Sequence, residues 1–165
     1  MNSPCNHDHL DKARSAGEVE RILDGVEASC VSEGERMTAP RRRVLELLLT
    51  AGEPVKAYDL IARFGANGEA AKPPTVYRAL EFLERRGAVH RIASISAYVA
   101  CSAHGDDVRA HAAAFLICDC CGSTAEVAVP LSELGLGAAA KAAGYDIQHT
   151  TIEGHGKCAH CQVSA

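Results

Sequence analysis

The sequence predicts an α+β protein made of two small domains, and three observations lead to this prediction. Residues 18–87 contain four stretches with the apolar spacing of amphipathic helices, and two short strand-like stretches follow them. After residue 110 the pattern changes to strand-like stretches interrupted by one helix. Two Cys-x-x-Cys pairs stand near the beginning and the end of this second part, which favours a small domain stapled by a metal.

Composition limits the size of the cores. The chain has 165 residues, of which 47% are hydrophobic but only 4% aromatic, and it has no Trp. Small cores built from Leu, Val, Ile and Ala usually need further stabilisation by a cross-link or a bound metal, and the eight Cys residues can supply it. We find neither a run of 18 apolar residues nor an apolar secretory segment, so we expect a cytoplasmic protein with no membrane partner and with reduced thiols.

Charge is distributed unevenly along the chain. Residues 36–91 hold eleven Lys or Arg and six acidic residues, a net charge of +5, whereas the rest of the chain carries −9. A basic block within an acidic chain indicates a surface for a polyanion such as nucleic acid. A solvated helical face explains the same charges equally well.

The N-terminal region is expected to begin with a flexible tail over residues 1–17. Cys5, His7 and His9 could bind a metal weakly there, although a tail without ligands is the simpler interpretation. A first helix over 18–31 follows, with Cys30 as a core thiol on its apolar stripe.

Two more helices precede a loop rich in Gly, Ala and Pro. Thr38 as N-cap and Pro40 in the first turn predict a helix that ends at Ala51-Gly52. A short helix over about 57–64 comes next. The loop then covers residues 65–74.

The fourth helix, TVYRALEFLERRG, is expected to begin with Thr75 as N-cap and to end at Gly87. Arg78 and Arg85 project from the side opposite its apolar face, as in a recognition helix that presents an Arg to a DNA groove. The apolar face is formed by Val76, Ala79, Leu80 and Leu83.

Two strand-like stretches, AVHRIAS and SAYVAC, follow this helix and predict a hairpin. Four helices and a two-stranded wing are typical of the winged helix-turn-helix DNA-binding domain, here over residues 18–101. In such domains the wing usually contacts phosphates and the recognition helix reads bases.

A polar hinge over 102–110 separates this domain from residues 111–165. We expect strands at AAFLIC, at 125–129 and at YDIQHTTIE, with a helix over 131–143. Three strands and one helix bury too little apolar surface to be stable alone. The sequence therefore predicts a small C-terminal α/β dimerisation domain with a zinc knuckle, in a homodimer.

The paired Cys-x-x-Cys motifs are the strongest chemical signal. Four thiolates close the tetrahedral sphere of Zn²⁺ and leave no open position for water, so the predicted site is structural. Its ligands are Cys118, Cys121, Cys158 and Cys161. A redox-active Cys-x-x-Cys is the main alternative, but it would need no second pair. Cys120 is interpreted as a bystander, although it could compete for the ion or be oxidised.

A second set of residues could bind a regulatory zinc. Two imidazoles, a thiolate and a carboxylate suit Zn²⁺, and together they would connect the two domains across the hinge. Each of these residues also has an ordinary explanation when it is taken singly, and His104 could replace one of them. The set is His90, Cys101, His111 and Glu126.

Several runs of residues resemble the zinc-responsive branch of the ferric uptake regulator family. They are TAPRRRVLELLLTAGEPVKAYDLIARF, AKPPTVYRALEFLERRGAVHRIASISAYVAC, HAAAFLICDCCG and IEGHGKCAHC, and together they span about residues 36–161. This resemblance implies a dimeric winged-helix repressor that binds palindromic, AT-rich operator DNA when zinc is plentiful and represses zinc-uptake genes.

The resemblance also implies roles for individual residues. The four Cys of the paired motifs fall on the structural site and the second set falls on the sensory site, which gives two Zn²⁺ per chain. Tyr58 and Arg78 fall on family positions that contact bases. Thr75 and Tyr77, next to Arg78, are expected to bind DNA as well.

Three other interpretations remain open at this stage. The first is an iron or peroxide sensor of the same family, although Cys101 favours zinc over Fe²⁺. The second is a zinc hydrolase or deaminase, but the sequence has neither HExxH nor HxE followed by PCxxC. The third is a thiol oxidoreductase. We expect a regulator, not an enzyme, with no small-molecule substrate.

Overall fold

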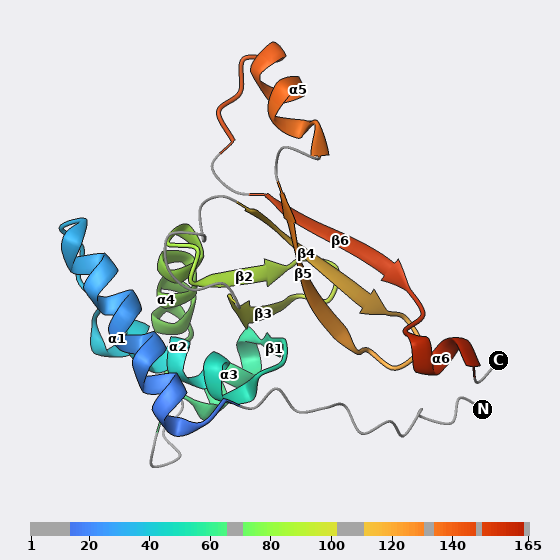
Figure 1. Cartoon of the computed structure of the whole chain (residues 1–165). Helices are drawn as coiled ribbons and strands as arrows, with labels where there is room; N and C mark the ends of the chain where they lie inside the picture. Colours follow the sequence, from blue (N-terminus) through green and yellow to red (C-terminus); the bar gives the residue numbers. More distant parts are fainter. Residues whose placement is uncertain (1–13, 66–70, 102–110, 131–133, 148–149, 164–165) are drawn as a thin grey trace. The chain divides into compact units, whose positions relative to one another are not determined.

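The computed structural model describes residues 14–65, 71–101, 111–130, 134–147 and 150–163 (Figure 1). These residues form two compact units, one before and one after the stretch 102–110. The tail residues Cys5, His7 and His9, the hinge and His104 lie outside the described residues. None of the described helices is long and apolar enough to cross a membrane.

The N-terminal unit consists of helices followed by a small sheet. Ser15 accepts a hydrogen bond from the Glu18 N–H and so caps the first helix, and Gly52, in the left-handed region at φ 65°, ends the second. In chain order the elements are α1 (Ala16–Ser32), α2 (Ala39–Ala51), β1 (Val55–Lys56), α3 (Ala57–Arg63), α4 (Pro73–Arg85), β2 (Val89–Ile92) and β3 (Ala97–Ala100).

Helix α4 begins three residues earlier than the sequence predicts. Its N-cap is Lys72, and Pro73 and Pro74 occupy its first turn. The fixed φ of Pro and its missing N–H suit the first helical positions, so the prolines initiate the helix. The prediction that Thr75 is the N-cap is therefore wrong. Gly87, at φ 70°, turns the chain from α4 towards β2.

The core of this unit lies between the helices. The apolar face predicted for α4 is buried, and α2 packs against it with Val44 and Leu48, neither of which is exposed. Cys30 is also fully buried, as expected for a core thiol. The predicted two-stranded wing is a three-stranded antiparallel sheet with the order β1-β3-β2. The two residues of β1 carry too short a pattern to be recognised in the sequence.

The C-terminal unit contains β4 (His111–Cys118), β5 (Thr124–Pro130), α5 (Leu136–Ala142), β6 (Thr151–Gly156) and α6 (Ala159–Val163). Strand β4 is central in the order β5-β4-β6 and pairs antiparallel with β5 and parallel with β6. The predicted α+β class is confirmed. No residue of α5 is buried.

Two predicted boundaries in this unit are wrong, and one helix is missed. Helix α5 begins at Leu136, because Gly135 before it takes a left-handed conformation at φ 62°; residues 131–133 of the predicted helix lie outside the described residues. Strand β6 begins at Thr151 and not at 145. Its register pairs Thr151 with Ala113, so residues 145–147 would lie beyond the start of β4. Helix α6, between the last two Cys, is not predicted at all.

Candidate metal centres and nucleic-acid interface

The strand register brings the two Cys-x-x-Cys pairs to the same end of one sheet. Cys118 is the last residue of β4 and is aligned with Gly156 at the end of β6. The Asp119 N–H donates to the Gly156 carbonyl over 2.8 Å, which holds the turn after β4 beside the end of β6. Cys158 therefore lies next to Cys118 although 40 positions separate them in the chain.

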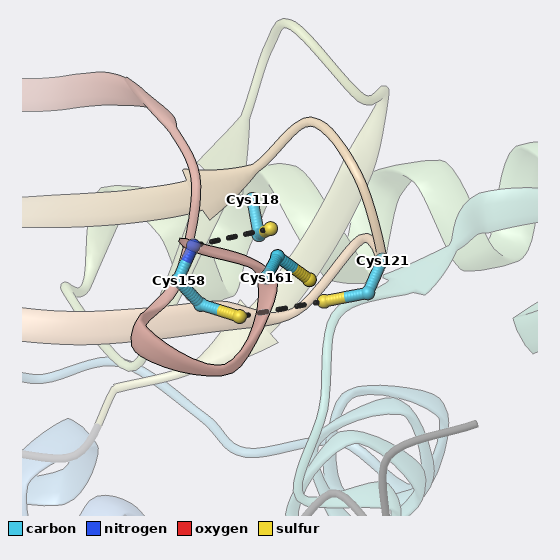
Figure 2. A group of neighbouring side chains, drawn as sticks. All are labelled: Cys118, Cys121, Cys158 and Cys161. Carbon is cyan, nitrogen blue, oxygen red and sulfur yellow. Dashed lines mark hydrogen bonds between the residues drawn. The ribbon is translucent and has the colours of Figure 1, made fainter. Parts of the chain in front are cut away.

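Local turns then direct all four thiols to one point. After Cys121 the chain reverses at Gly122, whose φ of 76° suits Gly, and the Gly122 N–H donates to the Cys118 carbonyl. After Cys158 the short helix α6 brings Cys161 back towards the other three. Figure 2 shows the four side chains converging, and all four Sγ atoms lie within 4.8 Å of one another.

The spacing of the sulfur atoms fits a tetrahedral zinc ion. Zn–S bonds of about 2.3 Å place two tetrahedral thiolates about 3.8 Å apart. The Sγ atoms of Cys121 and Cys158 are 3.8 Å apart. The site is largely enclosed, because Cys118 is 4% exposed and Cys161 3% exposed. The donor set and its geometry therefore fit Zn²⁺ in a closed site.

Backbone N–H groups favour the thiolate of Cys118. The Cys158 N–H donates to Cys118 Sγ over 3.3 Å (Figure 2). This contact, with those of the Cys121 and Cys120 N–H groups, lowers the pKa of Cys118 to about 6. Burial raises the pKa of Cys161 instead, so that thiol needs a positive partner to ionise.

Residues around the four thiols supply contacts that the sequence analysis does not anticipate. His155 Nδ1 lies 3.0 Å from a carboxylate oxygen of Asp119, and so connects the turn after β4 to β6. The sequence hints at this only in that Asp119 lies within the first Cys-x-x-Cys motif and His155 lies three residues before the second. Cys120 is exposed, unlike the four predicted ligands.

The second predicted set is divided between the two units. In the N-terminal unit, His90 on β2 is opposite Val99 on β3, and Cys101 follows β3 with its N–H donating to the Ala88 carbonyl. This register makes His90 and Cys101 diagonal neighbours on one face of the hairpin. Their ligand atoms lie within 4.8 Å of each other.

The other two residues of the set belong to the C-terminal unit. Glu126 is half-buried on β5, opposite Phe115 of β4. His111 is the first residue of β4, and its side chain lies outside the described part of the structure. The described geometry thus places His90 with Cys101, and the four-ligand set stays a prediction.

The predicted DNA-binding residues lie on α3 and α4. Tyr58 is 79% exposed and Tyr77 51% exposed, which is unusual for side chains of this size. Arg78 is exposed one residue after Tyr77, and in the described part of the chain no carboxylate pairs with it. Thr75 is half-buried in the first turn of α4. Two adjoining helices therefore present aromatic and cationic groups to solvent.

Part of the basic block is already neutralised within the unit. Arg42 contacts three carboxylates on α1, those of Glu20, Asp24 and Glu27. Similar pairs join Arg43 to Glu46, Arg85 to Glu35 and Arg86 to Glu33. The net charge of +5 therefore overstates the surface available to a polyanion, and the exposed Arg78 is less compensated than these four.

Comparisons with known proteins agree with this architecture. The zinc uptake regulation protein of Escherichia coli (strain K12) is 37% identical over 143 residues, which cover 87% of this chain and 82% of that protein. The zinc uptake regulation protein of Mycobacterium tuberculosis (strain ATCC 25618 / H37Rv) is 32% identical over 133 residues, or 78% of this chain and 96% of that protein.

Two solved structures are similar as well. A zinc uptake regulator complexed with zinc and DNA has a TM-score of 0.76 and 34% identity, covering 92% of this chain and 98% of its own. A crystal structure of holo XcZur has a TM-score of 0.70 and 43% identity, covering 87% of this chain and 98% of its own. The model of the ferric uptake regulator family matches residues 32–155. The chain belongs to the ferric uptake regulator family.

Proposed function

We propose that the chain is a zinc-responsive transcriptional repressor that binds operator DNA as a homodimer in the cytoplasm and controls zinc-uptake genes. One observation carries the proposal: the chain is similar over 92% of its length to a zinc uptake regulator whose solved structure is complexed with zinc and DNA. The four-thiol site and the exposed residues of α3 and α4 support it independently.

Two kinds of zinc site have different tasks in this proposal. Cys118, Cys121, Cys158 and Cys161 hold a structural ion that joins the two ends of the C-terminal unit. His90, Cys101, His111 and Glu126 hold a regulatory ion, which supplies attraction between ligands of the two units. This gives two Zn²⁺ per chain, and the thiolate of Cys101 favours zinc over iron.

Zinc control of DNA binding follows from where the regulatory ligands lie. Two of them belong to the unit that carries α4, and two belong to the C-terminal unit. Without the ion the two units sample many relative orientations; ligands from both units favour the orientation that fits the operator. The homodimer then presents two copies of Arg78 to a palindrome.

DNA recognition divides between reading and positioning contacts. Arg78 reads a base from the major groove, and Tyr58 contacts a base from the neighbouring helix. Tyr77 and Thr75 complete this surface beside Arg78. The proposed role is regulatory, because a closed four-thiolate site has no open metal position and the exposed groups of α3 and α4 suit DNA binding.

The test combines metal analysis with DNA binding. Protein purified without chelator should contain two zinc ions per chain, and mild chelation should remove only one of them. The remaining protein should bind a specific duplex far more weakly, and added zinc should restore the affinity. A protein that binds the duplex equally well with and without the chelator would contradict the proposal.

A further inference from the structure

Arg86 lies between helix α4, which carries Arg78, and strand β2, which carries His90. It is the C-cap of α4, eight residues after Arg78, and it precedes the turn at Gly87 that leads into β2 and His90. Its side chain is only 10% exposed. A charged group this enclosed needs specific partners.

The partners of Arg86 come from the end of α1 and the connection that follows it. One guanidinium nitrogen donates to the Glu33 carboxylate, and another donates to the Ser29 carbonyl over 3.3 Å and to its hydroxyl over 3.1 Å. Nε lies 3.7 Å from a carboxylate oxygen of Glu35. The hydrogen bond with Glu33 raises the pKa of Arg86, so its charge is permanent.

The backbone continues this contact into the metal-ligating hairpin. The Arg86 N–H donates to the Phe82 carbonyl, and the Ala88 N–H donates to the Leu83 carbonyl over 2.9 Å. The Ala88 carbonyl in turn accepts from the Cys101 N–H over 3.0 Å. The end of α4, the turn and the residue before β2 therefore form one hydrogen-bonded block that includes Cys101.

The acceptors on the other side are themselves held in place. The Glu35 N–H donates to the Cys30 carbonyl over 2.8 Å, and the Glu33 N–H donates to the same carbonyl over 3.2 Å. Cys30 is fully buried in the core. Arg86 thus connects the α4–β2 turn to a segment after α1 that is itself hydrogen-bonded to the carbonyl of the buried Cys30.

We propose that Arg86 is a positioning residue that fixes the orientation of α4 relative to the hairpin carrying His90 and Cys101, and thereby transmits metal binding to DNA reading. This inference rests on the proposed function. Zinc control requires coupling within the N-terminal unit, and the inference assigns this coupling to Arg86. An ion bound at the hairpin affects Arg78 only if α4 and β2 keep a fixed relative geometry.

The test compares Arg86→Met with a matched control. Arg86→Met keeps the length of the side chain and removes its charge, and Arg86→Lys keeps the charge without the forked donors. The control is Arg42→Met, because Arg42 also bonds α1 through several carboxylates but makes none of these contacts to the α4–β2 turn. All variants are made in the full-length protein.

The probe is a labelled duplex selected from a randomised library by the zinc-loaded wild type. The measured quantity is the ratio of its Kd with a chelator to its Kd with excess zinc. Arg86→Met should reduce this ratio by roughly tenfold, within the usual range of coupling between sites. Arg86→Lys should restore part of it, and Arg42→Met should leave it at the wild-type value even where the Tm falls.

Several outcomes would overturn the inference. If Arg86→Met leaves the Kd ratio unchanged, Arg86 only stabilises the fold. The same conclusion follows if Arg42→Met reduces the ratio as much as Arg86→Met does. If Arg86→Met does not fold, Glu33→Gln removes the partner instead, and an unchanged ratio there has the same meaning. If the Kd of the wild type for the duplex does not depend on zinc, the proposed function itself is wrong. This result is distinguishable from the outcomes above, which concern Arg86 alone.

Discussion

The Sγ atoms of Cys121 and Cys158 lie 3.8 Å apart although 37 positions separate the two residues in the chain. The register of β4 and β6 brings the two pairs together, although much of the described part of α5 and β6 is exposed or only half-buried. Four thiols in contact are stable only when their charge is compensated or their protons remain. A Zn²⁺ bound there would supply that compensation and would join the ends of β4 and β6.

Cys158→Ser should therefore remove one zinc per chain and the dimer together. Structural zinc contributes about 10–16 kcal/mol in zinc-finger peptides near pH 7, which exceeds the stability of a domain this small. Metal analysis and analytical ultracentrifugation measure the two losses. Cys120→Ser is the matched control, because this exposed Cys lies in the same turn and should keep both. A Cys158→Ser protein that stays dimeric and fully metallated would contradict the site.

Arg78→Ala should weaken operator binding by about 1–3 kcal/mol and relax the preference at one position of each half-site. Such a loss is expected from a bidentate contact to a base, most plausibly to O6 and N7 of G. Binding to a set of duplexes with single substitutions measures it. Arg63→Ala, an exposed Arg at the end of α3, serves as the control for charge alone. A uniform loss on all duplexes, with a salt slope shallower by about one, would make Arg78 a phosphate contact.

Periodic patterns predicted the helical half of the fold well. The apolar spacing in α4 is regular, and its buried face is the predicted one because four side chains repeat along one stripe. The errors lie at element boundaries, which one or two residues determine. Two prolines moved the start of α4, one left-handed Gly set the start of α5, and the partner strand determined where β6 begins.

The metal site could be predicted from a local sequence pattern, whereas the charged contacts could not. The four thiols are predictable because a spacing of two residues directs both Cys of a pair to one ion, whatever the rest of the fold does. The contacts of Arg42 and Arg86 join residues far apart in the chain, so no local pattern reveals them. For that reason the sequence indicated a broad basic surface where the structure has a narrower one.

Zinc control predicts reciprocal effects between the metal and the DNA. If zinc tightens operator binding by a certain factor, operator DNA must tighten binding of the regulatory zinc by the same factor. Titration of zinc into the protein with and without the duplex, in the presence of a competing chromophoric chelator, measures this factor. If operator DNA leaves the affinity for the regulatory zinc unchanged, this ion is not coupled to DNA binding.

The central claim is that Cys101, beside His90 on the hairpin, binds the zinc that controls DNA binding. The direct measurement is operator affinity against free zinc for the wild type, Cys101→Ser and the control Cys120→Ser. Cys101→Ser should remain a folded dimer that retains its structural zinc but needs far more free zinc to bind the operator, whereas Cys120→Ser should follow the wild-type curve. Identical zinc dependence in the wild type and Cys101→Ser would contradict the account.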